Sequence, residues 1–133
     1  MALDYSPLKK ALSSLKIALD RAAQHPKDNE LRDACIQRFE YSFELCWKML
    51  KRTLKDNLEA SEDVDTYSKR DLFRVSAKYK LLEKPEPWFS YLEKRNLTTH
   101  TYDEKNAEEV FSGINAFYHD ATYLLDNLTK TND

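Results

Sequence analysis

Glycine is almost absent from this 133-residue chain, which contains one glycine and four prolines. Tight β-hairpins depend on glycine at their turns, so this scarcity argues against a sheet of short hairpins and favours long helices. Positive charge is not in excess either, because the formal net charge is −2. The chain therefore does not bind nucleic acid through its overall charge, although a local basic patch can still do so.

Long apolar runs are absent as well. No stretch of the sequence approaches the roughly eighteen consecutive apolar residues of a membrane-spanning helix, so we expect no membrane association. The first residues, MALDYSPLKKALSSLK, lack the apolar core and the cleavage site of a signal peptide. We therefore expect a cytoplasmic protein rather than a secreted one.

The chain has only two cysteines, Cys35 and Cys46, and both fall in one segment of helical pattern. Eleven helical residues separate them by about 16 Å, which is too far for a disulfide, and return both to nearly the same apolar face. We expect reduced cysteines in the core of a cytoplasmic protein.

Spacings typical of metal and nucleotide sites are also missing. The histidines are His25, His100 and His119, and none has the His-x-x-His or Glu-x-x-His spacing of a helical metal site. The only glycine, Gly113, falls within a helical segment, so no glycine-rich phosphate loop is present. We therefore expect neither a metal nor a cofactor.

The sequence is rich in apolar residues at helical spacing. Intervals of three and four, with capping residues and prolines at the ends, predict helices over residues 6–25, 29–57, 68–80, 88–97 and 103–128. Residues 56–65 carry five acids and no base, which is typical of an exposed loop. We predict one all-α domain over residues 1–133, an antiparallel four-helix bundle with an additional short helix.

The second predicted helix has an apolar sector of roughly half its circumference, wider than that of an ordinary surface helix. It should pack against more than one neighbour, or against a neighbour and a second subunit. Arg38 projects within this sector. Either its stem packs while its head reaches water, or it pairs with a carboxylate across an interface.

Reactive side chains gather in the ten residues RNLTTHTYDE, which begin at Arg95. Arginine can hold a phosphate by a bidentate contact, and a histidine such as His100 can move a proton near neutral pH. On an ideal helix the two would lie about 140° apart, so they converge only if the helix distorts or if two copies face each other. Alternatively the segment is a polar helix end, with His100 capping carbonyls and Arg95 paired with Glu93 or Glu104.

Two segments resemble the signatures of one family. Residues 36–51, IQRFEYSFELCWKMLK, are similar to the IQRFEYTFELxWKxLK signature of nucleotidyltransferase substrate-binding proteins, a branch of the HEPN superfamily. The later RNLTTHTYDE resembles the second signature of that family, an Arg-Asn followed by His-x-Tyr. The resemblance extends over residues 6–128 and implies a HEPN-like helical domain.

The resemblance also implies a function. Such proteins form homodimers and are encoded beside a minimal nucleotidyltransferase, in pairs of the toxin–antitoxin type. In related toxins an arginine and a histidine four to six residues apart form a metal-independent ribonuclease site at the dimer cleft. Here these residues are Arg95 and His100, with Asn96 as the polar neighbour of the arginine. The nucleotidyltransferase inhibits some of these toxins by adenylylating a tyrosine, which here is Tyr102.

Two other interpretations remain. The protein can be a non-catalytic substrate-binding or adaptor subunit of the nucleotidyltransferase, or a helical dimer whose polar cleft is a remnant. Basic residues at 69–80, together with Lys48, Lys51, Arg52 and Lys55, can supply a rim that faces RNA, or can be ordinary solvated helix faces.

Overall fold

The computed structural model describes residues 3–56 and 63–132, so the predicted loop at 56–65 lies mostly outside the described residues. Within these ranges the regular structure is entirely helical. The α-helices are α1 (Ser6–Gln24), α2 (Asn29–Asp56), α3 (Lys69–Lys78), α4 (Glu86–Leu97), α5 (Glu104–Ser112) and α6 (Ile114–Asn132). Two 3₁₀ turns, η1 (Val64–Thr66) and η2 (Thr98–His100), complete the list.

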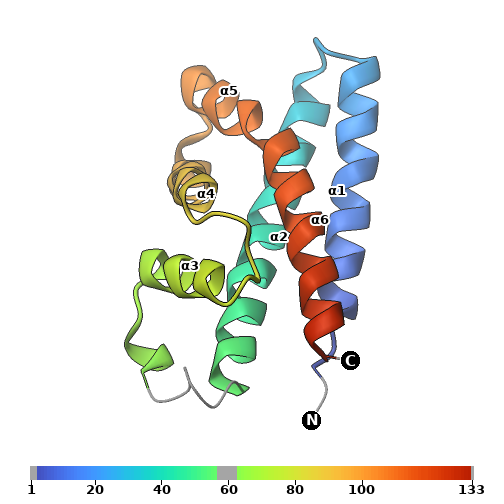
Figure 1. The fold of residues 1–133 in the computed structure, drawn as a ribbon. Coiled ribbons are helices and arrows are strands. Elements are labelled where there is room, and N and C mark those ends of the chain that lie inside the picture. Colours follow the sequence, from blue (N-terminus) through green and yellow to red (C-terminus); the bar gives the residue numbers. More distant parts are fainter. Residues whose placement is uncertain (1–2, 57–62, 133) are drawn as a thin grey trace.

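Helix α2 is the centre of the fold. It contacts each of the other α-helices, which accounts for its wide apolar sector. The long helices α1, α2 and α6 lie side by side, and α3, α4 and α5 lie along the other side of α2 (Figure 1). The predicted all-α helical bundle is confirmed.

Local sequence signals explain where α3 begins and ends. The Ser68 hydroxyl accepts a hydrogen bond from the backbone N–H of Asp71 at 3.1 Å, a side-chain cap of the first turn. At the other end Lys80 has a φ of 65°, and the Leu81 N–H donates to the Ser76 carbonyl at 2.9 Å. This is a Schellman motif with lysine at the position that glycine usually occupies. The helix therefore ends at Lys78, two residues before the predicted end.

The last predicted helix, residues 103–128, is divided at Gly113 into α5 and α6. A β-carbon at Gly113 would lie 2.4 Å from Cε of Lys94, so only glycine leaves room for that side chain in this position. The Lys94 Nζ lies 3.4 Å from Oε1 of Glu109. Pattern analysis missed the division because the apolar spacing continues through it.

An aromatic cluster joins α2, α3, α4 and α6 in the core. Its members are Phe39, Phe43, Phe73, Trp88, Tyr91 and Phe117. Trp88 is 2% exposed and lies edge-on to Tyr91 and Phe117, at centroid distances of 5.4 and 5.8 Å. Edge-to-face contacts of this kind add to the apolar burial. They fix α4 against α2 and α6, and thereby fix the segment that follows α4.

Two polar predictions have different outcomes. Cys35 and Cys46 are buried and unpaired, as predicted, and burial raises the pKa of both thiols. Arg38 is half-buried and donates from Nη1 to the Ser14 carbonyl of α1 at 2.7 Å. That contact is a third arrangement, which neither of the two predictions included.

None of the described helices combines the length and apolar content needed to cross a membrane.

Candidate functional site

The segment RNLTTHTYDE forms the junction between α4 and α5. Helix α4 tightens into the 3₁₀ turn η2 after Leu97, and the chain turns through Thr101–Asp103 before α5 begins at Glu104. The Asp103 side chain accepts a hydrogen bond from the Lys105 N–H at 2.9 Å and so caps α5. Helix distortion was one of the two conditions given for convergence of Arg95 and His100, and it is present here, because the 3₁₀ turn is more tightly wound than α-helix.

Arg95 is directed toward α2, where it pairs with Glu44. The distance from Nη2 to Oε1 is 2.5 Å, and the two side chains are 35% and 23% exposed. The other carboxylate oxygen, Oε2, accepts a hydrogen bond from Trp47 Nε1 at 2.9 Å. Glu44 Oε1 is itself buried, so the guanidinium supplies its compensating charge. The predicted pairing of Arg95 with Glu93 or Glu104 is wrong, since these acids pair with Arg70 and Arg32.

Glu40 supports the same junction one turn earlier on α2. The Thr98 hydroxyl is within hydrogen-bond distance of the Glu40 carboxylate and of the Arg95 carbonyl. Sequence reasoning missed both acids of α2, although a signal was present: the two glutamates lie four residues apart on one face of the helix, within the first family signature. Glu40 and Glu44, which belong to the first family signature, thus bind Thr98 and Arg95 of the second signature.

His100 and Tyr102 lie together on the surface. Their ring centroids are 6.0 Å apart with an interplanar angle of 70°, and Tyr102 is 86% exposed. The backbone carbonyl of His100, rather than its ring, makes the local hydrogen bonds, which come from Asn106 Nδ2 at 3.2 Å and from the Asp103 N–H. The predicted capping of carbonyls by the His100 side chain is therefore not observed.

The junction brings only some of the predicted site residues together. His100 neighbours Tyr102, while Arg95 faces Glu44 on α2 and Asn96 is exposed on α4. Among the described residues no hydrogen bond or ion pair joins the side chains of Arg95 and His100. Arg95 and His100 thus have separate surroundings, Arg95 on the side facing α2 and His100 on the exposed side next to Tyr102.

Arg32 fixes the start of α5. Its side chain is only 8% exposed, and Nη1 and Nη2 bind the two oxygens of Glu104 at 2.6 and 2.9 Å. Nη1 also binds Glu108 at 2.8 Å, and Nε binds Asp33 at 3.1 Å. The hydrogen bond from Arg32 lowers the pKa of the Glu104 carboxyl, and the surrounding acids, Glu104 foremost, raise the pKa of the guanidinium. The chain is therefore fastened to α2 on both sides of Tyr102.

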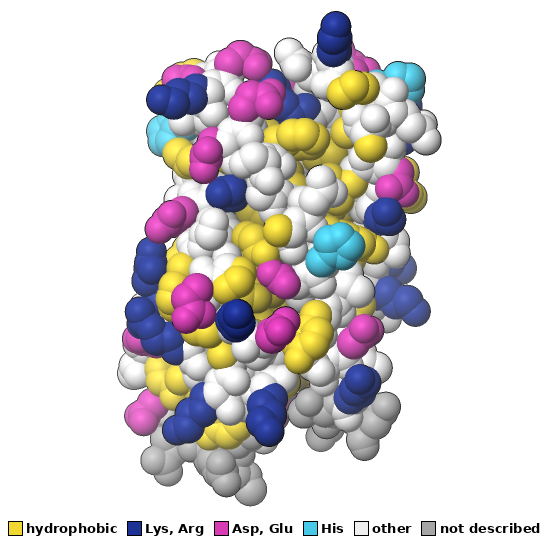
Figure 2. All heavy atoms as spheres, turned by 45° about the horizontal axis from the view of Figure 1, so that its top comes forward, with side chains coloured by type: hydrophobic (Ala, Val, Ile, Leu, Met, Phe, Trp, Pro, Cys, Tyr) yellow, Lys and Arg dark blue, Asp and Glu magenta, His cyan; other side chains and the backbone are white. Residues whose placement is uncertain are grey.

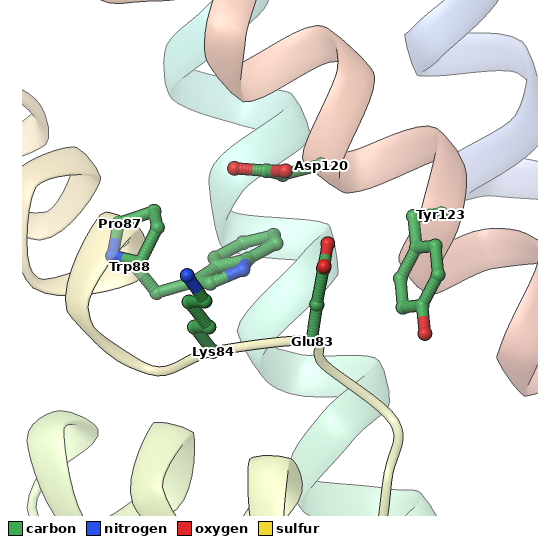
Figure 3. Close-up of a pocket in the computed structure, with 6 residues that line it drawn as sticks. All are labelled: Glu83, Lys84, Pro87, Trp88, Asp120 and Tyr123. Carbon is green, nitrogen blue, oxygen red and sulfur yellow. The ribbon is translucent and has the colours of Figure 1, made fainter.

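A separate cavity lies at the other end of α4. It has a volume of about 220 Å³ and is lined by Glu83, Lys84, Pro87, Trp88, Asp120 and Tyr123 (Figure 3). Eight helical residues, or about 12 Å, separate Pro87 from Arg95, so this cavity is not part of the junction. Among the described residues no three His, Cys, Asp or Glu side chains gather in an arrangement that could hold a metal ion.

Comparison with known proteins decides the family. Residues 3–130 match the family model of nucleotidyltransferase substrate binding protein like chains. The chain belongs to this family. It is 34% identical over 97 residues to a protein of Haemophilus influenzae named "Probable ribonuclease HepT", an alignment that covers 73% of this chain and 66% of that protein. The alignment thus spans just under two thirds of that relative.

Solved structures agree with this assignment. A structure from Haemophilus influenzae, described as the fold of a substrate binding domain of a nucleotidyltransferase, is similar with a TM-score of 0.88 and 28% identity, over 95% of this chain and 99% of that one. A crystal structure from Thermus thermophilus has a TM-score of 0.78 and 30% identity, over 91% and 98% of the two chains. The helical arrangement of this family member is therefore that of a known fold.

Proposed function

We propose that this family member is the ribonuclease of a two-component, toxin–antitoxin-type pair. In this proposal it acts in the cytoplasm as a homodimer that cleaves RNA without a metal, and a minimal nucleotidyltransferase encoded nearby inhibits it by adenylylating Tyr102. The observation that carries the proposal is the pairing of an 86% exposed tyrosine with the His100 ring 6.0 Å away. A group added to Tyr102 is thereby placed beside the one side chain of the junction suited to proton transfer.

The cleavage step needs a phosphate ligand and a base. The Arg95 guanidinium binds the scissile phosphate, with Asn96 beside it as a further polar contact. The ribose 2′ oxygen attacks the adjacent phosphorus and loses its proton to His100, and the bond from phosphorus to the 5′ oxygen breaks. The leaving 5′ oxygen takes a proton from water. The products are a 2′,3′-cyclic phosphate and a 5′-hydroxyl end.

A second copy of the chain completes this site in the proposal. Arg95 and His100 of one protomer serve separate functions, so the proposed cleft combines Arg95 of one copy with His100 of the other. This arrangement is consistent with the two side chains having different partners in the described chain, Glu44 for Arg95 and Tyr102 for His100.

The inhibitory step is a nucleotidyl transfer. The phenol oxygen of Tyr102 attacks the α-phosphorus of ATP, a new oxygen–phosphorus bond forms, pyrophosphate leaves and the phenol proton passes to solvent. The product carries a negatively charged phosphodiester beside His100. It competes with RNA phosphate for the cations of the cleft and occupies the space that substrate needs.

One observation favours a second candidate function. Glu44 already neutralises Arg95 across 2.5 Å, as expected for an arginine with a structural task. In that case the chain is a non-catalytic substrate-binding or adaptor subunit of the nucleotidyltransferase. The description of the matched family and of the Haemophilus influenzae structure supports this alternative.

The test combines RNA cleavage with intact-mass measurement. Purified wild type should cleave RNA in the presence of a chelator, and His100→Ala should reduce the rate at least about 100-fold. His119→Ala, which removes an exposed histidine of α6, is the matched control and should leave the rate unchanged.

Co-expression with the nucleotidyltransferase and ATP tests the regulatory half. The mass should rise by one or more AMP units, the rise should be absent in Tyr102→Phe, and Tyr123→Phe should be modified like wild type. Intact RNA together with a stable, unmodified complex of the two proteins would instead support the adaptor.

A further inference from the structure

Two aromatic side chains near the junction carry cations over their rings. On α2, Trp47 has Lys69 Nζ at 4.6 Å and Lys48 Nζ at 5.9 Å from a ring centroid. On α4, Phe89 has the guanidinium carbons of Arg70 and Arg74 each 5.0 Å from its ring centroid. These six residues, from α2, α3 and α4, are named here the aromatic–basic surface.

The aromatic–basic surface is continuous with the candidate site. Trp47 donates its indole N–H to Glu44, and the other oxygen of Glu44 binds Arg95. Phe89 precedes Arg95 by six residues on α4, a rise of about 9 Å. The Trp47 end of the surface therefore adjoins Arg95 through Glu44, and Phe89 lies farther along α4 on a side about 120° away from Arg95.

The charge of this region differs from that of the whole chain. Residues 68–84 contain six lysines or arginines against two acids, whereas the net charge of the chain is −2. Figure 2 shows lysine and arginine side chains, together with hydrophobic ones and some acids, along the side of the molecule where α3 and α4 lie. Such a local concentration of positive charge attracts a polyanion that the chain as a whole does not.

The ion pairs within the surface are exposed. Arg70 binds Glu93 at 3.2 Å and Arg74 binds Asp71 at 3.1 Å, and all four side chains are 44–69% exposed. Exposed pairs of this kind contribute little free energy. A phosphate can therefore replace either carboxylate at small cost, while the arginine keeps its position over Phe89.

We propose that the aromatic–basic surface binds single-stranded RNA and leads its backbone to Arg95. Stacking on Trp47 and on the Arg–Phe89 pairs requires unpaired bases, because the bases of a duplex are already stacked on one another. The cations next to each ring bind the phosphates between those bases. The proposal deepens the proposed function, on which its reference to a cleavage site rests, and it names single-stranded RNA as the substrate class.

The test measures binding separately from cleavage. In the His100→Ala background, which keeps RNA intact, fluorescence anisotropy gives the Kd for a labelled oligouridine and for an RNA duplex of equal length. We expect tighter binding of the single strand. Phe89→Leu or Trp47→Leu should each weaken it about 5- to 30-fold.

A double variant tests how the charges of the surface contribute to RNA binding without changing any buried side chain. Arg70→Gln with Arg74→Gln changes only exposed side chains, and it should lower the slope of log K against log salt by about 1.4. Lys9→Gln with Lys10→Gln on α1 is the matched control, because it removes two exposed cations outside the surface. Its Kd should stay within about twofold of the parent.

The outcomes distinguish this inference from the proposed function. If wild type cleaves RNA but the surface variants bind and cleave as the parent does, the inference is overturned and the proposed function stands. If oligouridine binds through the surface but no RNA is cleaved, the inference stands without the ribonuclease. If the surface variants lose binding to the nucleotidyltransferase while no RNA binds, the surface is a protein interface and the inference is wrong.

Discussion

Replacing Glu44 by glutamine tests whether the ion pair with Arg95 positions the end of α4. The amide keeps the shape of the side chain but removes the negative charge. It leaves the guanidinium without its partner at a site where the arginine is 35% exposed. The perturbation therefore isolates charge from packing.

The expected coupling free energy between Glu44 and Arg95 follows from the burial of the pair. Two unit charges 4 Å apart attract by about 4 kcal/mol at an effective dielectric constant of 20, but desolvation offsets much of this. Fully exposed pairs retain about 0.2–1 kcal/mol, and hydrogen bonds to charged groups about 1.5–3 kcal/mol. A pair that is roughly one quarter to one third exposed should lie between these values, so we expect a coupling free energy of about 1–2 kcal/mol.

The assay is a double-mutant cycle of urea unfolding with Glu44→Gln, Arg95→Met and the double variant. The exposed pair of Arg70 and Glu93 provides the control cycle, which should give a coupling of no more than about 0.5 kcal/mol. If the effects of Glu44→Gln and Arg95→Met add to within about 0.3 kcal/mol, then Glu44 does not hold Arg95 in solution. The proposed separation of the phosphate-binding and proton-transfer groups would then lose its structural basis.

Three further predictions concern stability. Lys80→Gly should raise the free energy of unfolding by about 0.5–1 kcal/mol, because it relieves left-handed backbone strain at Lys80. The control Lys78→Gly, at the last residue of α3, should lower the free energy of unfolding by a similar amount. If both variants shift the urea midpoint in the same direction, the strain argument is wrong. Ser76→Ala should be neutral or stabilising by about 1 kcal/mol in thermal unfolding, because the buried hydroxyl has no hydrogen-bond partner among the described residues, and a clear loss of Tm would show that it has one in solution. Arg32 lowers the pKa of the Glu104 carboxyl from its ordinary value of 4.5. The ion pair of Arg32 and Glu104 therefore stabilises the fold fully above the ordinary pKa, and this stabilisation is lost as the pH falls through the lowered pKa of the folded state. The difference in urea midpoint between wild type and Glu104→Gln should therefore shrink between pH 6 and pH 3, and a constant difference would refute the linkage.

Helical periodicity predicted the fold because each helix buries one face against α2. The positions of the cysteines and the existence of five helical segments follow from that pattern alone. The division at Gly113 does not, because the apolar spacing continues without a break from α5 into α6. The αL conformation of Lys80 is hidden for a similar reason, since lysine gives no local signal for it.

The candidate site was predicted residue by residue but not as a set of contacts. The segment from Arg95 to Tyr102 could be selected from its reactive side chains and from the family signatures. The pairing of Arg95 with Glu44 joins residues 51 positions apart, and local spacing favoured the nearer Glu93 and Glu104. Those acids are held by other arginines, a competition that only the three-dimensional arrangement settles.

The anchoring of both ends of the α4–α5 junction has a consequence for any enzyme that modifies Tyr102. Thr98 is hydrogen-bonded to Glu40, and Glu104 is paired with Arg32. Tyr102 therefore lies in a short turn whose two ends are both held against α2. A modifying enzyme must dock against this folded corner instead of drawing an extended segment into its own active site. A free peptide with the sequence of residues 95–104 should accordingly be a poor substrate for this modification. The modifying enzyme should therefore require the folded chain and not only the local sequence around Tyr102.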